Sequence, residues 1–384
     1  MGSLKEKILG LRGLLSLGFS DIVGNVISMF FWFYIATLLD VDKYGQVNYL
    51  IGIAGMAATF SLLGNTNVIT VITAKKIPLQ STLYLLTLIA GIFSSITVFV
   101  IIHSPEVSLL IIGYIIGTLA LAELIGRKLF NKYSRYVLTQ KILTVIIGIG
   151  LHHLIGINGI IIGLALSYAP FLIRIIQEFK STKIDFKLLR TNQEFISTNY
   201  VSTIVDAFKN NIDRLIIVPI LGYTVLGHYV LALQIVSVVS MAPQIIFKYI
   251  LTEDARGNQN KKLKLTTIVG SGIIVLIVIT VLPHIIPLYF PKYIDAISAL
   301  RIMSFVIISS TITLILYSRL LAMEKSRFLL ISKSCMVSTM IMGIMTIGQT
   351  LGLEGVAYSF VLSSITETVF LLFITYRMRS KVVR

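Results

Sequence analysis

Long apolar runs separated by short polar gaps are the main feature of this chain. Apolar segments of about 20 residues, the length that an α-helix needs to cross a bilayer, occur about twelve times. The longest polar gaps, near 178–197 and 251–264, have the length of linkers, so we expect no sizeable soluble domain. The pattern predicts an all-α polytopic membrane protein with about 12 transmembrane helices, near residues 14–39, 45–72, 80–102, 108–126, 136–156, 158–177, 198–221, 225–247, 265–287, 296–318, 328–350 and 355–376.

Composition supports this prediction, and the placement of charge gives an orientation. Hydrophobic residues make up 56% of the chain and charged residues only 13%, against about a quarter charged in soluble domains. Most of the 33 Lys and Arg residues fall in every second gap between the apolar runs. By the positive-inside rule we expect a membrane protein with both termini cytoplasmic. The net charge is +16, and most of its positive charges lie in every second loop and not along one surface. We therefore expect anionic membrane lipids, and no nucleic acid, as its partners.

Two pairs of segments repeat in the same order. LLDVDKYGQVNYL at 38–50 matches ILGYTVLGHYVLA at 220–232, which aligns Gly45 with Gly227. LIGINGIIIGLALS at 154–167 matches TLGLEGVAYSFVLS at 350–363. Six helices per half is an even number, so both halves share one orientation. We predict an N-terminal six-helix half, 1–190, and a C-terminal six-helix half, 191–384, related by a parallel pseudo-two-fold repeat around a central cleft.

The seventh predicted span carries a polar stripe at spacings of three and four residues, which places its members on one face of a helix. The stripe and its two flanking cations are Asn199, Thr203, Asp206, Asn210 and Asp213, with Lys209 and Arg214. Ionisable groups inside a span are costly and generally functional or paired. Two interpretations stay open: the stripe lines a wet cavity, or an Asp–Lys or Asp–Arg pair joins two helices.

Other spans add polar residues of the same kinds. Asp21, Asn25 and Trp32 share a face of the first span, Gln234 lies in the eighth, and Arg301 lies in the tenth. Fixed cations suit an anionic head group, because buried phosphate favours charge-assisted donors. Asn, Gln and Trp suit the hydroxyls and ring faces of sugars. We predict substrate-binding residues Lys209, Arg214, Arg301, Asn210, Asn25, Trp32 and Gln234, and coupling-ion candidates Asp21, Asp206 and Asp213, for which ion pairing is the alternative.

Signatures of enzymatic sites are missing from the sequence. It contains no GxxxxGK[ST], HExxH or GxSxG motif, so ATP hydrolysis and familiar hydrolase chemistry have no site. The single cysteine, Cys335, excludes an intramolecular disulfide and a cysteine metal cluster. We therefore expect a protein that is not an enzyme and that uses no cofactor and no metal.

Several segments carry a resemblance to a known family. They are NNIDRLIIVPILGYTVLGHYVLALQIVSVVSMAPQ at 210–244, IIPLYFPKYIDAISALRIMSF at 285–305, LGLEGVAYSFVLS at 351–363 and KYGQVNYL at 43–50. These segments resemble the polysaccharide (O-antigen-type) flippases of the multidrug/oligosaccharidyl-lipid/polysaccharide exporter (MOP) superfamily. One departure is Leu39-Asp40-Val41, where the family usually has Leu-Gly-Pro.

The resemblance implies a flippase that moves a lipid-linked oligosaccharide of the polyprenyl pyrophosphate type across the plasma membrane by alternating access. It also implies glycosyltransferases or a polymerase of the same pathway as partners. One alternative is a cation-coupled drug or metabolite exporter of the same superfamily. A second is a membrane enzyme or scaffold of glycan assembly that transports nothing.

Overall fold

The computed structural model describes residues 2–63, 66–255, 260–323 and 325–382, and its described part contains helices and no strands. The predicted all-α class is confirmed. The helices up to residue 181 are α1 (Gly2–Leu38), α2 (Val41–Ser61), α3 (Thr66–Ala74), α4 (Gln80–Ile102), α5 (Pro105–Gly126), α6 (Phe130–Ile155), α7 (Ile157–Leu166), η1 (Ala169–Phe171) and α8 (Leu172–Ser181). The remaining helices are α9 (Phe186–Thr191), α10 (Gln193–Val239), α11 (Met241–Ala255), α12 (Lys261–Thr280), α13 (Leu282–Tyr289), η2 (Pro291–Tyr293), α14 (Ala296–Met303), α15 (Val306–Ala322), α16 (Ser326–Gly343), η3 (Ile344–Gly348) and α17 (Gln349–Val382).

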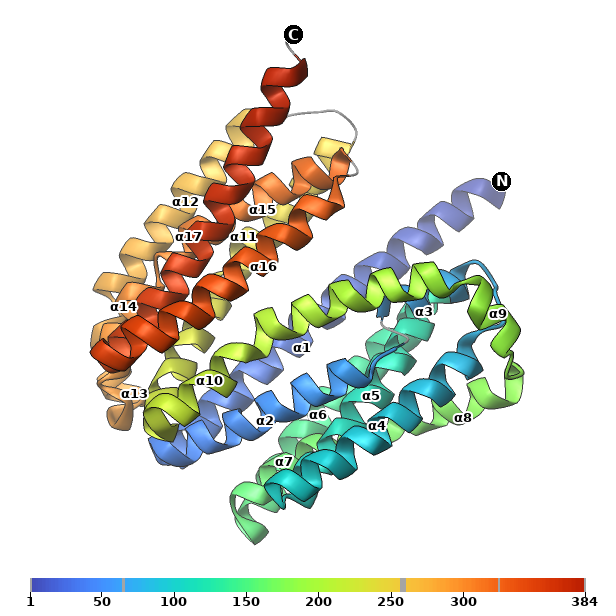
Figure 1. Ribbon diagram of the computed structural model, residues 1–384, viewed down its shortest axis with the longest axis horizontal. Helices are drawn as coiled ribbons and strands as arrows, with labels where there is room; N and C mark the ends of the chain where they lie inside the picture. Colours follow the sequence, from blue (N-terminus) through green and yellow to red (C-terminus); the bar gives the residue numbers. More distant parts are fainter. Residues whose placement is uncertain (1, 64–65, 256–259, 324, 383–384) are drawn as a thin grey trace. The chain divides into compact units, whose positions relative to one another are not determined.

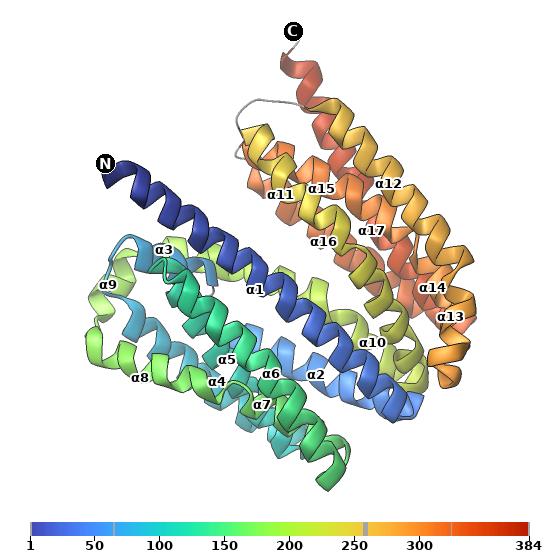
Figure 2. The same cartoon turned by 180° about the vertical axis from the view of Figure 1, so that it is seen from behind.

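Nine of the described helical stretches are long and apolar enough to cross a membrane, and the number is ten if α2 and α3, which differ in direction by 42°, are taken together as one span. Two of the nine, Gln193–Phe247 and Arg327–Met378, run for 55 and 52 residues, about twice what one crossing needs. Each contains one glycine with a non-helical backbone, Gly222 (φ 85°) and Gly352 (φ 59°). Figures 1 and 2 show α10 and the α16–α17 segment folding back in a hairpin. Divided at these glycines, the two stretches supply the four predicted spans between 198 and 247 and between 328 and 376.

The second pair of matched segments forms two hairpins with the same geometry. Gly156 and Gly352 have φ values of 70° and 59°, which L-residues with side chains rarely adopt. Three residues later, Gly159 and Gly355 lie against the backbone of the preceding helix, where a Cβ atom would overlap the carbonyl oxygens of Leu151 and Ile347. The glycines of both segments are therefore required by the turn and by the close approach after it.

Contacts divide the chain into two compact units. Unit 1 consists of 1–32 and 50–207, and unit 2 of 33–49 and 208–384. The predicted halves, 1–190 and 191–384, are defined by the sequence repeat and stay a prediction. The units follow another division, because 33–49 packs with the second half and 191–207 packs with the first.

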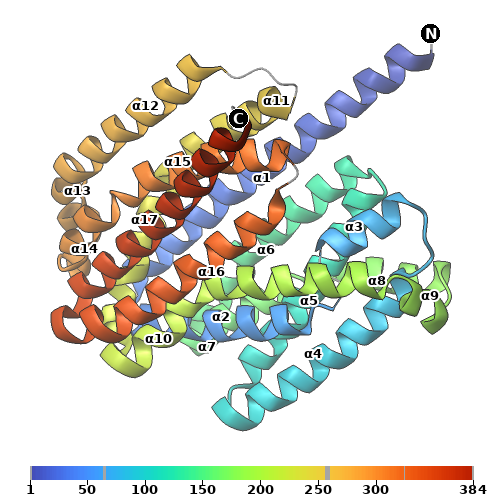
Figure 3. The ribbon, with the colours of Figure 1, turned by 45° about the horizontal axis from the view of Figure 1, so that its top comes forward.

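One helix is central to each unit. In unit 1, 67% of the apolar window of α5 is buried, against 17% for α4. Leu110, Ile111 and Leu119 of α5 are fully enclosed, with α3, α4 and α7 around them. In unit 2, 56% of the apolar window of Ala296–Ala322 is buried, and α15 packs against α11, α12 and α17 (Figure 3). The more exposed apolar helices have the surface that a lipid environment requires.

Within unit 2, the first pair of matched segments packs together. A Cβ atom on Gly45 would overlap the carbonyl oxygen of Tyr223, and one on Gly227 would overlap that of Val41. The contact is reciprocal, because Val41 and Tyr223 are themselves equivalent positions of the repeat. The hydroxyl of Thr224 donates to Asp42, its own equivalent, at 3.2 Å. Helices α2 and α10 thus cross at a backbone-to-backbone contact that only glycine permits.

Candidate functional site

Unit 2 holds an ion pair on the polar stripe of α10. Lys209 Nζ lies 3.1 Å from Glu367 Oε2 and 3.2 Å from Oε1, so α10 is joined to α17. Glu367 is buried, with 4% of its side chain exposed, and it also accepts a hydrogen bond from the hydroxyl of Tyr317 on α15. A carboxylate within an apolar span is stable only with partners of this kind. The carboxylate that Lys209 binds in this pair is therefore Glu367 of α17, a residue that the stripe does not contain.

Asp213, one turn further along α10, is buried and held by neutral donors. Its Oδ1 accepts from the backbone N–H of Arg214 at 2.8 Å, and its Oδ2 accepts from the hydroxyl of Tyr229 at 2.9 Å. The guanidinium of Arg214 forms no ion pair with Asp213 in the described structure, and its Nε is buried without a hydrogen-bond partner among the described residues. The arrangement differs from the Asp–Arg pair considered as an alternative, and it leaves a charged donor available inside the span.

The remaining predicted residues of unit 2 lie in different settings. Gln234 accepts a hydrogen bond from Tyr44 at 2.8 Å, and Tyr44 also stacks edge-on against Tyr293. Asn210 and Arg301 are exposed. The structure therefore brings Gln234 into a packed layer with α2, whereas Asn210 and Arg301 stay at the surface of the unit.

Unit 1 holds the other four predicted residues. Asp21 accepts from the hydroxyl of Tyr133 on α6 at 3.1 Å. Trp32 is half-buried with its ring edge against Phe31, at a centroid distance of 5.1 Å, and Asn25 is exposed. Asp206 is half-buried in the first part of α10. Asp21 and Asp213 thus share one feature, a tyrosine hydroxyl donor, which comes from α6 for Asp21 and from the part of α10 after Gly222 for Asp213.

Sequence reasoning missed three buried carboxylates, Glu123, Glu178 and Glu367. Arg174 forms a two-pronged pair with Glu123 (2.7 and 2.8 Å), and Arg127 binds both Glu123 and Glu178. Each is a single carboxylate in or beside an apolar segment, so the cost of an ionisable group in a span could have identified it. Within the part of the chain that the structure describes, no three His, Cys, Asp or Glu side chains are placed to hold a metal ion.

Comparisons with known proteins give the fold. No sequence-family model and no curated protein matches the chain. The structure of the lipid II flippase MurJ in an inward closed conformation matches with a TM-score of 0.70 and 14% identity, over 94% of this chain and 87% of that one. An inward-facing MATE multidrug resistance transporter of the MOP superfamily matches with a TM-score of 0.66 and 14% identity, over 96% and 98%. A MOP superfamily transporter from Pyrococcus furiosus matches with 0.57 and 13%, over 97% and 94%.

At these identities the likeness shows the fold alone. The chain is a multi-pass membrane protein, and its fold is that of the matched MOP superfamily structures. This fold agrees with the superfamily expected from the sequence, and membership of that superfamily and of its O-antigen-type family stays a prediction. The matched proteins are themselves transporters and flippases.

Proposed function

We propose that the protein is a plasma-membrane flippase, with both termini cytoplasmic, that moves a lipid-linked oligosaccharide of the polyprenyl pyrophosphate type by alternating access. The fold supports transport, and the lipid II flippase among its structural neighbours acts on a lipid-linked substrate. The alternating loop charge supports the orientation. Glycosyltransferases or a polymerase of the same pathway would supply or consume the glycan.

The observation that carries the proposal is the unpartnered Nε of Arg214. A buried donor without an acceptor costs about 1–3 kcal/mol, and more when it is charged. Such a donor is retained where an acceptor arrives, and a phosphate oxygen is the acceptor that a guanidinium fits best. Arg214 lies beside Asp213, which is occupied by its own neutral donors. A pyrophosphate would therefore meet a guanidinium whose Nε has no hydrogen-bond partner among the described residues.

The other residues have subsidiary roles in this proposal. Lys209 and Arg301 add positive charge, and Lys209 becomes available when its bond to Glu367 opens. Asn25, Trp32, Asn210 and Gln234 provide amide groups and a ring face for sugars. Asp21, Asp206 and Asp213 bind the coupling ion or proton.

Purified protein in liposomes tests the proposal. We expect the parent to carry a fluorescent polyprenyl-pyrophosphate oligosaccharide across the bilayer, measured by its accessibility to an impermeant quencher. Arg214→Gln should weaken binding of this substrate roughly 10- to 150-fold, the equivalent of one charge-assisted hydrogen bond. Arg214→Lys should recover part of the loss, because it keeps the charge without the planar fork.

Arg135→Gln is the matched control, since it removes an exposed cation outside the stripe. Its substrate affinity should equal that of the parent. Unchanged affinity in Arg214→Gln would rule out the phosphate role. If Arg214 is instead consumed by an aspartate in another state of the protein, replacing Arg214 and Asp213 together should restore both folding and binding.

Cation-coupled export is the second candidate function, and the Lys209–Glu367 pair favours it. A buried carboxylate that binds a lysine can exchange this partner for a proton or a metal ion, as coupled transport requires. Multidrug transporters with this fold are among the structural neighbours. Uptake of a cationic dye into liposomes driven by a proton or sodium gradient, together with failure to bind the lipid-linked glycan, would favour the exporter.

A further inference from the structure

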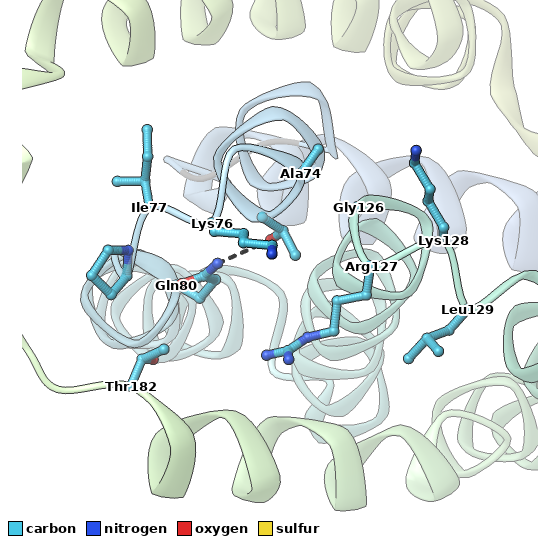
Figure 4. Close-up of a pocket in the computed structure, with 11 residues that line it drawn as sticks. Ala74, Lys76, Ile77, Gln80, Gly126, Arg127, Lys128, Leu129 and Thr182 are labelled. Carbon is cyan, nitrogen blue, oxygen red and sulfur yellow. Dashed lines mark hydrogen bonds between the residues drawn. The ribbon is translucent and has the colours of Figure 1, made fainter.

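A cavity of about 700 Å³ lies within unit 1, away from the stripe of α10. Three cations, Lys76, Arg127 and Lys128, line it together with Gln80, Thr73 and Thr182. No carboxylate is among its lining residues. Figure 4 shows Lys76 and Arg127 extending toward the middle of the site, with Lys128 at the edge beside Arg127. The volume is within the range of known small-molecule sites.

Close packing brings the ends of four helices together at this cavity. Gly126, the last residue of α5, lies so near α3 that a Cβ atom would come within 2.6 Å of Thr73 Cβ. The backbone N–H of Ser81, at the start of α4, donates to Thr182 Oγ1 after α8, and the backbone N–H of Asp185 donates to Thr82 Oγ1 at 2.8 Å. The cations therefore meet at fixed helix ends.

Two of the cations occupy strained backbone positions. Lys76 and Lys128 have φ values of 57° and 58°, in the left-handed region. Each follows the end of a helix, and the next residue bonds back to the helix, Ile77 to Ile72 and Leu129 to Leu124. Glycine is the usual residue at this position, because a side chain there is disfavoured. A lysine in this disfavoured backbone conformation occurs twice at one cavity, and backbone strain of this kind concentrates at functional sites.

Of the three lining cations, Arg127 is paired with carboxylates, whereas the two lysines are not paired with any described residue. Arg127 and Arg174 together face Glu123 and Glu178. Lys76 and Lys128 have no ion-pair partner in the described part of the chain. The site thus has an excess of positive charge that an anion would compensate.

A buried polar atom also points to a ligand. Gln80 is 4% exposed, and its Nε2 donates to Thr73 Oγ1 at 3.2 Å. Its Oε1 is buried without a hydrogen-bond partner among the described residues. With the amide turned over, the oxygen would accept from Thr73 and the NH₂ group would donate into the cavity. Gln80 can therefore serve an acceptor or a donor on the ligand.

We propose that this cavity binds a phosphate group, held by Lys76 and Arg127, with Lys128 at the rim and Gln80 as a neutral partner. The group belongs to the head of an anionic membrane lipid or to a soluble phosphate. The site is separate from the proposed transport function, since its residues lie outside the stripe and its ligand is not the transported substrate.

Binding to the purified full-length protein in detergent tests the proposal. The probes are phosphatidic acid, diacylglycerol with the same acyl chains, and inorganic phosphate, and the measurement is titration by native mass spectrometry. We expect phosphatidic acid to bind and diacylglycerol not to, because they differ only in the phosphate. Lys76→Gln should weaken binding about tenfold, equivalent to about 1.4 kcal/mol.

Two further variants make the test specific. Lys75→Gln removes the same charge from the neighbouring exposed residue, which does not line the cavity, and it should bind like the parent. Lys76→Gly removes the charge while favouring the backbone conformation. It should be at least as stable as the parent on heating and should still lose binding, so that a folding defect cannot explain the loss.

The probes identify the source of the phosphate. If inorganic phosphate binds with the same dependence on Lys76 and displaces phosphatidic acid, the ligand is a soluble phosphate. If phosphatidic acid alone binds, the ligand is a lipid head group. Equal losses in Lys75→Gln and Lys76→Gln, equal binding of diacylglycerol, or no effect of either Lys76 variant would each overturn the proposal.

Discussion

Gly45 of the first matched segment and Gly227 of the second pack against each other's backbone segments. A Cβ atom built on Gly45 would lie 3.0 Å from the backbone nitrogen of Gly227. The contact joins α2 to the part of α10 after Gly222 within unit 2. It leaves no room for a side chain on either residue.

Alanine at Gly45 or Gly227 should therefore destabilise unit 2. Overpacking a close contact costs about 1–3 kcal/mol, and here backbone atoms would have to move. Gly270→Ala in α12 is the matched control, because nothing lies within 4 Å of its Cβ position and alanine is the better helix former. Thermal unfolding in detergent measures the difference, and equal stability of all three variants would contradict the close contact.

Alanine substitutions at the two hairpin glycines, Gly156 and Gly352, should lower stability by similar amounts. Gly156→Ala and Gly352→Ala place a side chain on backbones with φ near 70° and 59° and similar ψ values. We expect each to lose at least about 1 kcal/mol of stability, the usual cost of a disfavoured backbone region. Unfolding measurements on the two variants check this. A large loss in one and none in the other would show that the two turns are not equivalent.

Replacing Lys209 alone should lower the free energy of unfolding more than replacing Lys209 and Glu367 together. Lys209→Met leaves Glu367 buried with only Tyr317, and we expect a loss of about 2–4 kcal/mol, somewhat below the range for a fully enclosed pair because Lys209 is 26% exposed. The double variant Lys209→Met with Glu367→Gln should regain part of this loss. A double-mutant cycle on the unfolding free energies gives the coupling, and strictly additive losses would mean that the pair contributes nothing to stability.

A substitution at Asn210 can distinguish a role in transport from a role in folding. It is exposed on unit 2, one residue from Lys209. If it lines the substrate path, Asn210→Leu should abolish transport while the protein stays abundant in the membrane. A fall in abundance with normal transport per molecule would assign Asn210 to packing instead. Immunoblotting alongside the liposome assay distinguishes the two outcomes.

Loop charge predicts which residues face outward. With Cys335 replaced by serine, single cysteines at Thr224 and Glu354 should react with a membrane-impermeant maleimide added to whole cells. Single cysteines at Lys183 and Lys262 should react only after lysis. All four positions are exposed, so lack of reaction reflects sidedness and not burial. The opposite pattern would reverse the predicted orientation.

The membrane spans could be predicted from hydropathy, because the length and composition of a membrane helix are local properties of the sequence. The matched glycines could also be found from the sequence, since a turn such as that at Gly352 tolerates few other residues. The partners of the buried charged side chains could not be predicted from the sequence. The partner of Lys209 is a single glutamate 158 residues away, and Asp213 is held by a tyrosine that composition counts as hydrophobic. Such contacts depend on which helices pack together, and this is decided by the tertiary fold.

The reciprocal glycine contact has a consequence for the ancestry of the chain. In a half-length protein that paired with a second copy about a two-fold axis, one glycine would serve both sides of this contact. Joining two such copies into one chain keeps the contact and lets each position change alone. Asp40 shows such a change: its counterpart, Gly222, has a φ value of 85°, whereas Asp40 binds Lys292 at 2.8 Å. The hydrogen bond and charge of Lys292 hold the pKa of Asp40 below its ordinary value, so of the two equivalent positions Asp40 carries an ion pair, whereas Gly222 has no side chain to form one.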